Sequence, residues 1–285
     1  MKKTFSILAI ATICAITIIG NNACVDSTEK KDSLKVVAEE KPLNISIFLD
    51  LSDRIIRDLT PSQMERDNAI VGYVIDYFIQ QTQGAKILQS KNNIKVFFYP
   101  TPKMSEIATL AADLSVDMSE MPKSVARRET LERMKKQFQD NLSAIYNKTL
   151  ETGKYPGCDI WDFFSSKKVD SQCMREGYRN ILIILTDGYL YDENHKVVRG
   201  DSTSFISAST LANPNSALIV KRQGLENIEV RILEVNPIDI NHRDRLVSVL
   251  EEWLKDMGVK EDNITVSETS LPTNTQTIIK SFLYE

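Results

Sequence analysis

Two apolar stretches decide the fold: residues 43–51 read LNISIFLDL, and residues 181–185 read ILIIL. The first begins with alternating apolar and polar residues and ends as an apolar run, while the second is apolar throughout. This character is typical of strands that are buried on both faces of a parallel sheet. Residues 94–99 (IKVFFY) and 228–235 (IEVRILEV) predict two further strands, and residues 264–266 predict a shorter one at an edge.

Helical patterns alternate with these strands. Residues 60–63 (TPSQ) are typical of a capping box with proline at the first helical position, and apolar residues follow at helical spacing as far as Gly84. A longer helix is predicted from about residue 131 to Gly153, because apolar residues recur there every three or four positions. Further helices are predicted at residues 159–168, 241–258 and 273–283.

The alternation of strands and helices predicts the fold class α/β: a doubly wound, mostly parallel sheet with helices on both faces. We expect one such domain over residues 43–285, with an inserted region around residues 101–153. Residues 101–126 of that region predict only irregular structure with short helices. In folds of this class ligands bind beyond the carboxyl ends of the strands, where the strand order reverses. The chemistry is therefore expected at residues that directly follow strands.

The first residues of the chain predict export. Lys2 and Lys3 precede a mostly apolar run that stops before Cys24, which is the layout of a signal peptide. At roughly 15 residues this run is shorter than the ~20 that a transmembrane helix needs, so cleavage is preferred to a membrane-spanning anchor. The segment resembles a bacterial lipoprotein signal, although Asn21 and Asn22 depart from its usual pattern.

This resemblance implies a signal peptide over residues 1–23, a lipid on Cys24 that ties the chain to a membrane, and a location in the bacterial cell envelope, on its periplasmic or its surface face. A plain secreted protein with an incidental Cys24 is the alternative. Residues 24–42 are mostly charged and polar, and they predict a flexible tether because they hold too few large apolar residues to fold.

Charge and cysteine usage narrow the classes of partner. The whole chain has a formal net charge of −4, and removal of the two lysines with the signal leaves about −6. Such an acidic chain lacks the basic surface that nucleic-acid binding needs, so no nucleic-acid partner is expected. In an exported chain Cys158 and Cys173 meet oxidising conditions, where a disulfide is permitted. We leave open whether these two thiols are bridged or both buried.

Acidic residues directly follow two of the predicted strands. The first strand continues into residues 50–54 (DLSDR), and the later one into residues 186–188 (TDG). This pairing resembles the metal-ion-dependent adhesion site of von Willebrand factor A domains. The resemblance spans most of residues 43–283. It implies that Asp50, Ser52 and Asp187 hold Mg²⁺ and leave one position open for an acidic group of a protein partner. Hard oxygen ligands of this kind suit Mg²⁺.

The chain departs from this family's pattern in two places. Arg54 stands where the family has a second serine, and a guanidinium donates hydrogen bonds and cannot ligate a cation. Residues 157–160 (GCDI) stand where a threonine is expected, with Cys158 or Asp159 as the matching residue. Asp159 would add a carboxylate ligand, whereas Arg54 could pair with Asp50 or Asp187 as an internal cation and replace the metal.

Other interpretations of these carboxylates stay open. Asp50 and Asp187 could cap nearby helix N-termini without any metal. Glu234, on a later strand, could reach the same cluster or could face water at the end of the sheet. Mg²⁺ is therefore an optional cofactor in this interpretation, and Arg54 as an internal cation is the slightly favoured one.

The favoured function is a membrane-tethered binding module that recognises a protein partner, as yet unknown, at the strand carboxyl-end face. One alternative is a divalent-metal-dependent hydrolase that uses Asp50 and Asp187, and another is a structural envelope protein with a vestigial site. No catalytic motif supports an enzyme: His195 and His242 are expected at the surface, and no glycine-rich phosphate loop occurs. The Arg-Gly-Asp triplet at residues 199–201 is expected to form a turn.

Overall fold

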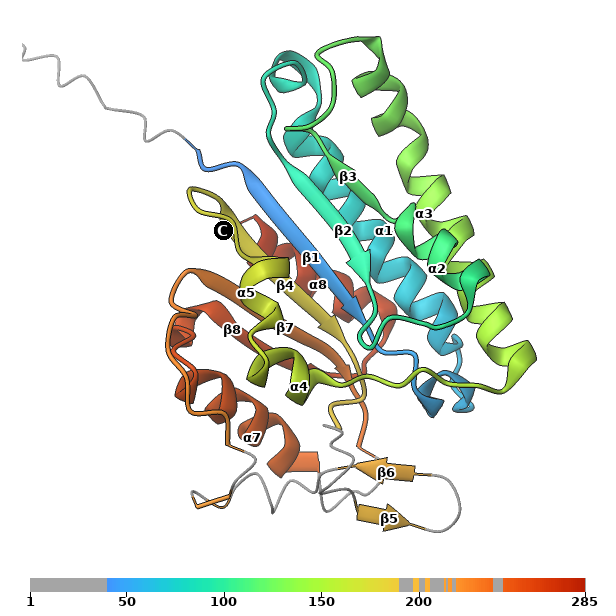
Figure 1. Cartoon of the computed structure of the whole chain (residues 1–285), viewed down its shortest axis with the longest axis vertical. Coiled ribbons are helices and arrows are strands. Elements are labelled where there is room, and N and C mark those ends of the chain that lie inside the picture. Colours follow the sequence, from blue (N-terminus) through green and yellow to red (C-terminus); the bar gives the residue numbers. More distant parts are fainter. Residues whose placement is uncertain are drawn as a thin grey trace, which may run out of the picture. The chain divides into compact units, whose positions relative to one another are not determined.

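The computed structural model describes residues 40–189, 197–199, 203–205, 213, 215–216, 219–237 and 243–284 (Figure 1). The predictions for the signal peptide, for Cys24, for most of the tether and for both histidines lie outside these residues, as do Gly200 and Asp201 of the Arg-Gly-Asp triplet. Among the helices that the structure describes, none combines the length and the apolar character that crossing a bilayer requires.

A six-stranded sheet in the order β3-β2-β1-β4-β7-β8 forms the centre of residues 40–285. Its strands are β1 (Leu43–Leu49), β2 (Asn93–Phe97), β3 (Ser115–Asp117), β4 (Arg179–Leu185), β7 (Ile228–Val235) and β8 (Ile264–Glu268). All neighbouring pairs are parallel except β2 and β3. A separate two-stranded hairpin is formed by β5 (Val197–Arg199) and β6 (Thr203–Phe205).

Helices cover both faces of this sheet, which confirms the predicted fold class. The helices are α1 (Gln63–Thr82), α2 (Ser105–Ala112), α3 (Val125–Thr152), α4 (Ile160–Ser165), α5 (Lys168–Cys173), α7 (Arg243–Asp256) and α8 (Pro272–Leu283). Apolar residues of α1, α3 and α8 pack on one face of the central strands, and those of α4, α5 and α7 pack on the other (Figure 1). This two-sided burial explains why five of the seven residues in each of β1 and β4 are apolar.

Helix α1 begins two residues later than the sequence pattern predicts. Its capping box joins Ser62 and Glu65: the Ser62 hydroxyl accepts a hydrogen bond from the Glu65 amide, and the Glu65 carboxylate accepts one from the Ser62 amide. Thr60 and Pro61 therefore precede the helix instead of starting it. The shift matters for the candidate site, because it sets which residues of the first turns face the sheet.

The inserted region contains a short strand that the sequence did not predict. Residues 101–126 include α2 and the three-residue strand β3, which pairs antiparallel with β2. Helix α3 then begins at Val125, earlier than predicted, and ends where expected, with Gly153 in the left-handed conformation (φ 61°). Its start is fixed by the buried side chain of Arg127, which donates hydrogen bonds to five backbone carbonyls.

The helix predicted at residues 159–168 is in fact two short helices, and this separates the cysteines. Lys167, with φ 59°, interrupts the helical path between α4 and α5. Asp159, next to Cys158, contacts the Tyr99 carbonyl beyond the end of β2, whereas the Cys173 carbonyl accepts a hydrogen bond from Asn44 at the start of β1. The seven residues of β1 span roughly 20 Å, and a disulfide allows only about 7 Å between Cα atoms. Both thiols are free and buried, so the bridge is absent.

Candidate functional site

The candidate site lies between the carboxyl ends of β1 and β4, where the order of the strands reverses. Asp50 follows β1, and its amide donates to the Leu185 carbonyl at 3.0 Å. Its Oδ1 accepts a hydrogen bond from the Ser52 amide at 2.7 Å, and its Oδ2 accepts one from the Thr186 hydroxyl at 2.7 Å. Asp50 is only 1% exposed, so both of its oxygens are occupied inside the protein.

Asp187 is paired with an arginine that the sequence did not single out. Arg57 Nη2 lies 2.5 Å from Asp187 Oδ2, and Arg57 Nη1 donates to the Asn236 carbonyl at 2.6 Å. Arg57 thereby joins the ends of β4 and β7. The other Asp187 oxygen accepts from the Tyr189 amide at 3.2 Å, and Asp187 is 7% exposed. Gly188 follows with φ 90°, and an added side chain there would press on Val235 and Leu246.

Arg54 is a buried internal cation, but its main partner is a residue of α1. Its Nη2 lies 2.6 Å from Asp67 Oδ2, and its Nε donates to the Asp50 carbonyl at 3.0 Å. The distance from Nε to Asp50 Oδ2 is longer, at 3.8 Å. Asp67 also accepts hydrogen bonds from the Tyr146 hydroxyl and, at 3.0 Å, from Gln63. The sequence predicts that Arg54 pairs with Asp50 or Asp187. The structure places Arg54 beside Asp50, and Asp187 pairs with Arg57 instead.

Glu234 is buried and does not face water. It is 2% exposed, and its carboxylate lies 3.6 Å from Arg66 Nη1 and within hydrogen-bond range of Thr269 and Thr275. Its backbone has φ 67°, a conformation that is strained for a residue with a side chain, beside an irregularity in the pairing of β7 with β8. Glu234 therefore forms an adjoining ion pair with Arg66 and does not contact Asp50 or Asp187 directly.

A pattern in α1 could have identified the buried acid that sequence reasoning missed. Gln63 and Asp67 stand four residues apart on the same face as the apolar residues Ile70, Val71 and Val74. A carboxylate on the buried face of a helix requires a cation or hydrogen-bond donors. No comparable signal marks Arg57, because the sequence does not specify which of two nearby arginines reaches which carboxylate.

The residues present do not fit a Mg²⁺ site. The Ser52 hydroxyl accepts a hydrogen bond from the Arg54 amide and caps the turn at Asp53–Ile56. The Asp159 carboxylate accepts from the Asp162 amide at 2.8 Å and caps α4. In the part of the chain that the structure describes, no three acidic, histidine or cysteine side chains are grouped to hold a metal ion. Two guanidinium groups lie beside the carboxylates that would have to bind the cation.

Burial sets the proton affinities in this cluster. For Arg54, burial opposes the charge, but Asp67, Tyr146 and Asp50 outweigh it and raise the arginine's pKa. Burial also raises the pKa of Asp67. The pKa of Asp187 is raised to about 7 by burial and by the charge of Asp50, which together outweigh the opposing charge of Arg57. Burial, with a contribution from Asp50, likewise raises the pKa of the Cys158 thiol.

We expect the free energy of unfolding to fall as pH rises from about 5 to 8. An unfolded aspartate loses its proton near pH 3.9, whereas folded Asp187 keeps its proton to about pH 7. Between these values the folded state binds more protons, so stability decreases as pH increases through the window. The raised pKa values of Asp67 and Glu234 act in the same direction.

Urea unfolding at several pH values measures this dependence. Asp187→Asn should flatten it, because the amide cannot titrate, while Asp58→Asn, at an exposed position outside the cluster, should leave it unchanged. Stability that increases from pH 5 to 8 would show that Arg57 controls Asp187 more strongly than burial does.

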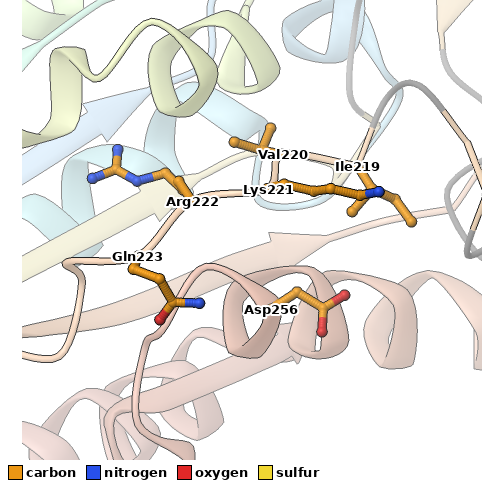
Figure 2. Close-up of a pocket in the computed structure, with 6 residues that line it drawn as sticks. All are labelled: Ile219, Val220, Lys221, Arg222, Gln223 and Asp256. Carbon is orange, nitrogen blue, oxygen red and sulfur yellow. The ribbon is translucent and has the colours of Figure 1, made fainter.

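A cavity of about 490 Å³ lies elsewhere, beside the end of α7 (Figure 2). Its lining residues are Ile219, Val220, Lys221, Arg222, Gln223 and Asp256. Arg222 is engaged by Asp170 at 2.6 Å, and its guanidinium points away from the Asp256 carboxylate (Figure 2). None of the residues predicted for the functional site lines this cavity. The cavity is therefore separate from the candidate site.

Comparison with known proteins gives similarity in shape only. No protein-family model and no curated protein matches the chain. An aerotolerance-related membrane protein from Bacteroides fragilis matches 85% of this chain and 98% of its own, with 14% identity and a TM-score of 0.38. BatB from Bacteroides thetaiotaomicron, described as a conserved hypothetical protein, matches 85% of this chain and 100% of its own, with 14% identity and a TM-score of 0.39.

The pilus adhesin SpaC from Lactobacillus rhamnosus GG matches 87% of this chain, with 11% identity and a TM-score of 0.44, and the match spans 30% of the adhesin. At these identities and TM-scores the likeness carries no inference about what the chain binds.

Proposed function

We propose that the chain is a binding module, held in the bacterial cell envelope by a lipid on Cys24, that recognises a protein partner with the carboxyl-end face of its sheet. The cations of the site are Arg54 and Arg57, and recognition does not require Mg²⁺. The observation that carries this proposal is the closed state of the carboxylates: Asp50 and Asp187 are 1% and 7% exposed, and each is occupied by internal donors.

Because the carboxylates of Asp50 and Asp187 are buried and bonded to internal donors, they favour binding of a partner at the protein surface over catalysis in a pocket. A hydrolase would need Asp50 and Asp187 open to a substrate or to a metal-bound water. Here the cluster instead supports the turn at Asp53–Ile56, whose last residue, Ile56, is 57% exposed. Buried charges are costly unless they are paired. Because Arg54 lies in the turn and is paired with Asp67 and the Asp50 carbonyl, we infer that the network holds the turn in one position. The exposed side chain of Ile56 therefore projects from a turn that the buried ion pairs fix in place.

A photo-crosslinking amino acid in place of Ile56 tests this function in intact cells. We expect it to form a discrete crosslinked product with a partner protein. The matched control is Leu88, which is similarly exposed but precedes β2, at the opposite end of the sheet. Asp187→Ala should weaken the Ile56 product, because it removes the partner of Arg57. Equal products from both positions, or none from Ile56, would favour the structural envelope protein with a vestigial site.

The proposed anchor has its own test. Cys24→Ser removes the residue that would be acylated, so the protein is expected to leave the membrane fraction. Fractionation of cells followed by immunoblotting measures this distribution, with Cys14→Ser as the matched control, because that cysteine lies within the predicted signal. A Cys24→Ser protein that stays wholly membrane-bound would contradict lipidation at this residue.

A further inference from the structure

The amino-terminal edge of the sheet carries a surface that the proposed function does not use. Residue 40 begins the described domain, and Lys86 lies 2.7 Å from Glu40 in an ion pair. The Leu43 amide donates to the Asn92 side chain at 2.9 Å, so the start of β1 adjoins the loop before β2. We call residues 40–41, 86–91 and 119–129 together the amino-edge surface.

Arg127 holds the segments of this surface together. Its guanidinium donates to the carbonyls of Ile87 and Ser90 at 2.8 and 3.1 Å, and to that of Met121 at 2.9 Å. The loop before β2 and the start of α3 are therefore fixed to each other. The apolar side chains of Leu88, in that loop, and Val125, the first residue of α3, are 50% and 72% exposed. Both side chains therefore project from segments that the hydrogen bonds of Arg127 fix in place.

Basic residues outnumber acidic ones on the amino-edge surface. The three segments contain six basic residues, of which Arg127 is buried, against three acidic ones, in a chain whose total charge is −4. Another segment at the same edge has the opposite balance, because residues 255–262 carry three acidic and two basic residues. The positive surplus of this surface coincides with two exposed apolar side chains, those of Leu88 and Val125.

We propose that the amino-edge surface rests on the anionic headgroups of a membrane. Residues 24–39, which are mostly charged and polar, are the part of the predicted mature chain that precedes the domain, and they connect to it at residue 40, within this surface. Basic residues are attracted to anionic lipid, and exposed apolar side chains enter the interface. A domain docked in this way turns the carboxyl-end face away from the bilayer. The proposal depends neither on a lipid at Cys24 nor on the partner site.

Helix α3 supplies a matched pair of positions for the test. Its 28 residues span roughly 40 Å from the amino to the carboxyl end of the sheet, with exposed Val125 at one end and exposed Leu150 at the other. The full chain with Val125→Cys, or with Leu150→Cys, is labelled with an environment-sensitive fluorophore. Each is reconstituted with vesicles of phosphatidylcholine, with or without phosphatidylglycerol. The unsubstituted chain, treated identically, gives the background from native cysteines.

We expect the emission of the Val125 label to shift to shorter wavelength when phosphatidylglycerol is present, and salt to reverse the shift. The Leu150 label should not respond. Lys123→Glu with Arg128→Glu, both at exposed positions, should reduce the docked-to-undocked ratio about tenfold or more without changing the circular dichroism spectrum. Three results would overturn the proposal: no shift at Val125, an equal shift at Leu150, or a shift that follows protein density instead of lipid charge, which would indicate contact with a second copy.

Discussion

Replacing Arg54 with leucine is expected to lower the free energy of unfolding by about 3–5 kcal/mol, as removal of one partner from a buried ion pair does. Asp67 is 0% exposed and would keep only hydrogen bonds from Tyr146 and Gln63. Its charge would then lack a cation inside the protein. Urea unfolding, followed by circular dichroism, measures the loss.

Two further variants distinguish a lost ion pair from lost packing. Asp67→Asn added to Arg54→Leu should recover part of the loss, because it removes the stranded charge. Arg57→Leu should cost less than Arg54→Leu, since the side chains of Arg57 and Asp187 are 21% and 10% exposed, whereas those of Arg54 and Asp67 are 1% and 0% exposed. Equal losses for Arg54→Leu and Arg57→Leu would mean that Arg54 is not the principal cation of the cluster.

The same position tests the replacement of the metal by arginine. Arg54→Ser restores the Asp-x-Ser-x-Ser pattern that the family resemblance implies, and it removes the charge that occupies the cation's place. Calorimetry should detect little Mg²⁺ binding to the unsubstituted chain and measurable binding to Arg54→Ser. If the unsubstituted chain binds Mg²⁺ at micromolar concentration and Asp187→Ala abolishes the binding, the internal-cation proposal is wrong.

A loss of similar size, about 3 kcal/mol or more, is expected for Arg127→Leu. The Arg127 guanidinium satisfies the carbonyls of Ile87, Ser90, Met118, Met121 and Pro122. Without it, carbonyls in two segments lose their donor, and those that stay buried cannot turn to water. Thermal and urea unfolding measure the loss.

Neighbouring variants give the controls for Arg127. Arg128→Leu, at an exposed position, should change stability by no more than about 0.5 kcal/mol. Arg127→Lys keeps the charge but lacks the planar arrangement of donors, so most of the loss should remain. A lysine variant as stable as the original would show that charge alone, and not the set of five hydrogen bonds, fixes the start of α3.

The sequence predicts the strands of this fold well because burial on both faces leaves a strong apolar signal. β1, β4 and β7 were predicted within a few residues, whereas β3 has only three residues and no such signal. The break at Lys167 was missed for a different reason. A left-handed residue between two short helices is set by the packing of α4 and α5 on the sheet, and lysine is not a residue that marks such a conformation.

The sequence predicts where the acidic residues of the candidate site lie, but it does not predict which arginine pairs with which carboxylate. Asp50 and Asp187 lie together because parallel strands end at one edge of the sheet. The pairing of Arg54 with Asp67 could not be predicted in the same way. It joins a turn after β1 to the buried face of α1, and it depends on the register between a helix and a sheet, which spacing along one chain does not contain.

The separation of Cys158 and Cys173 by the length of β1 has a consequence for how the domain is made. With both thiols free, the fold needs no oxidant and no disulfide-exchange catalyst, and its maturation avoids steps that take seconds to hours. Residues 40–285 can reach the same native state in a reducing cell interior as beyond a membrane. Recombinant production in an ordinary bacterial cytoplasm is therefore expected to give the free thiols that the structure has at these two cysteines, without oxidative refolding.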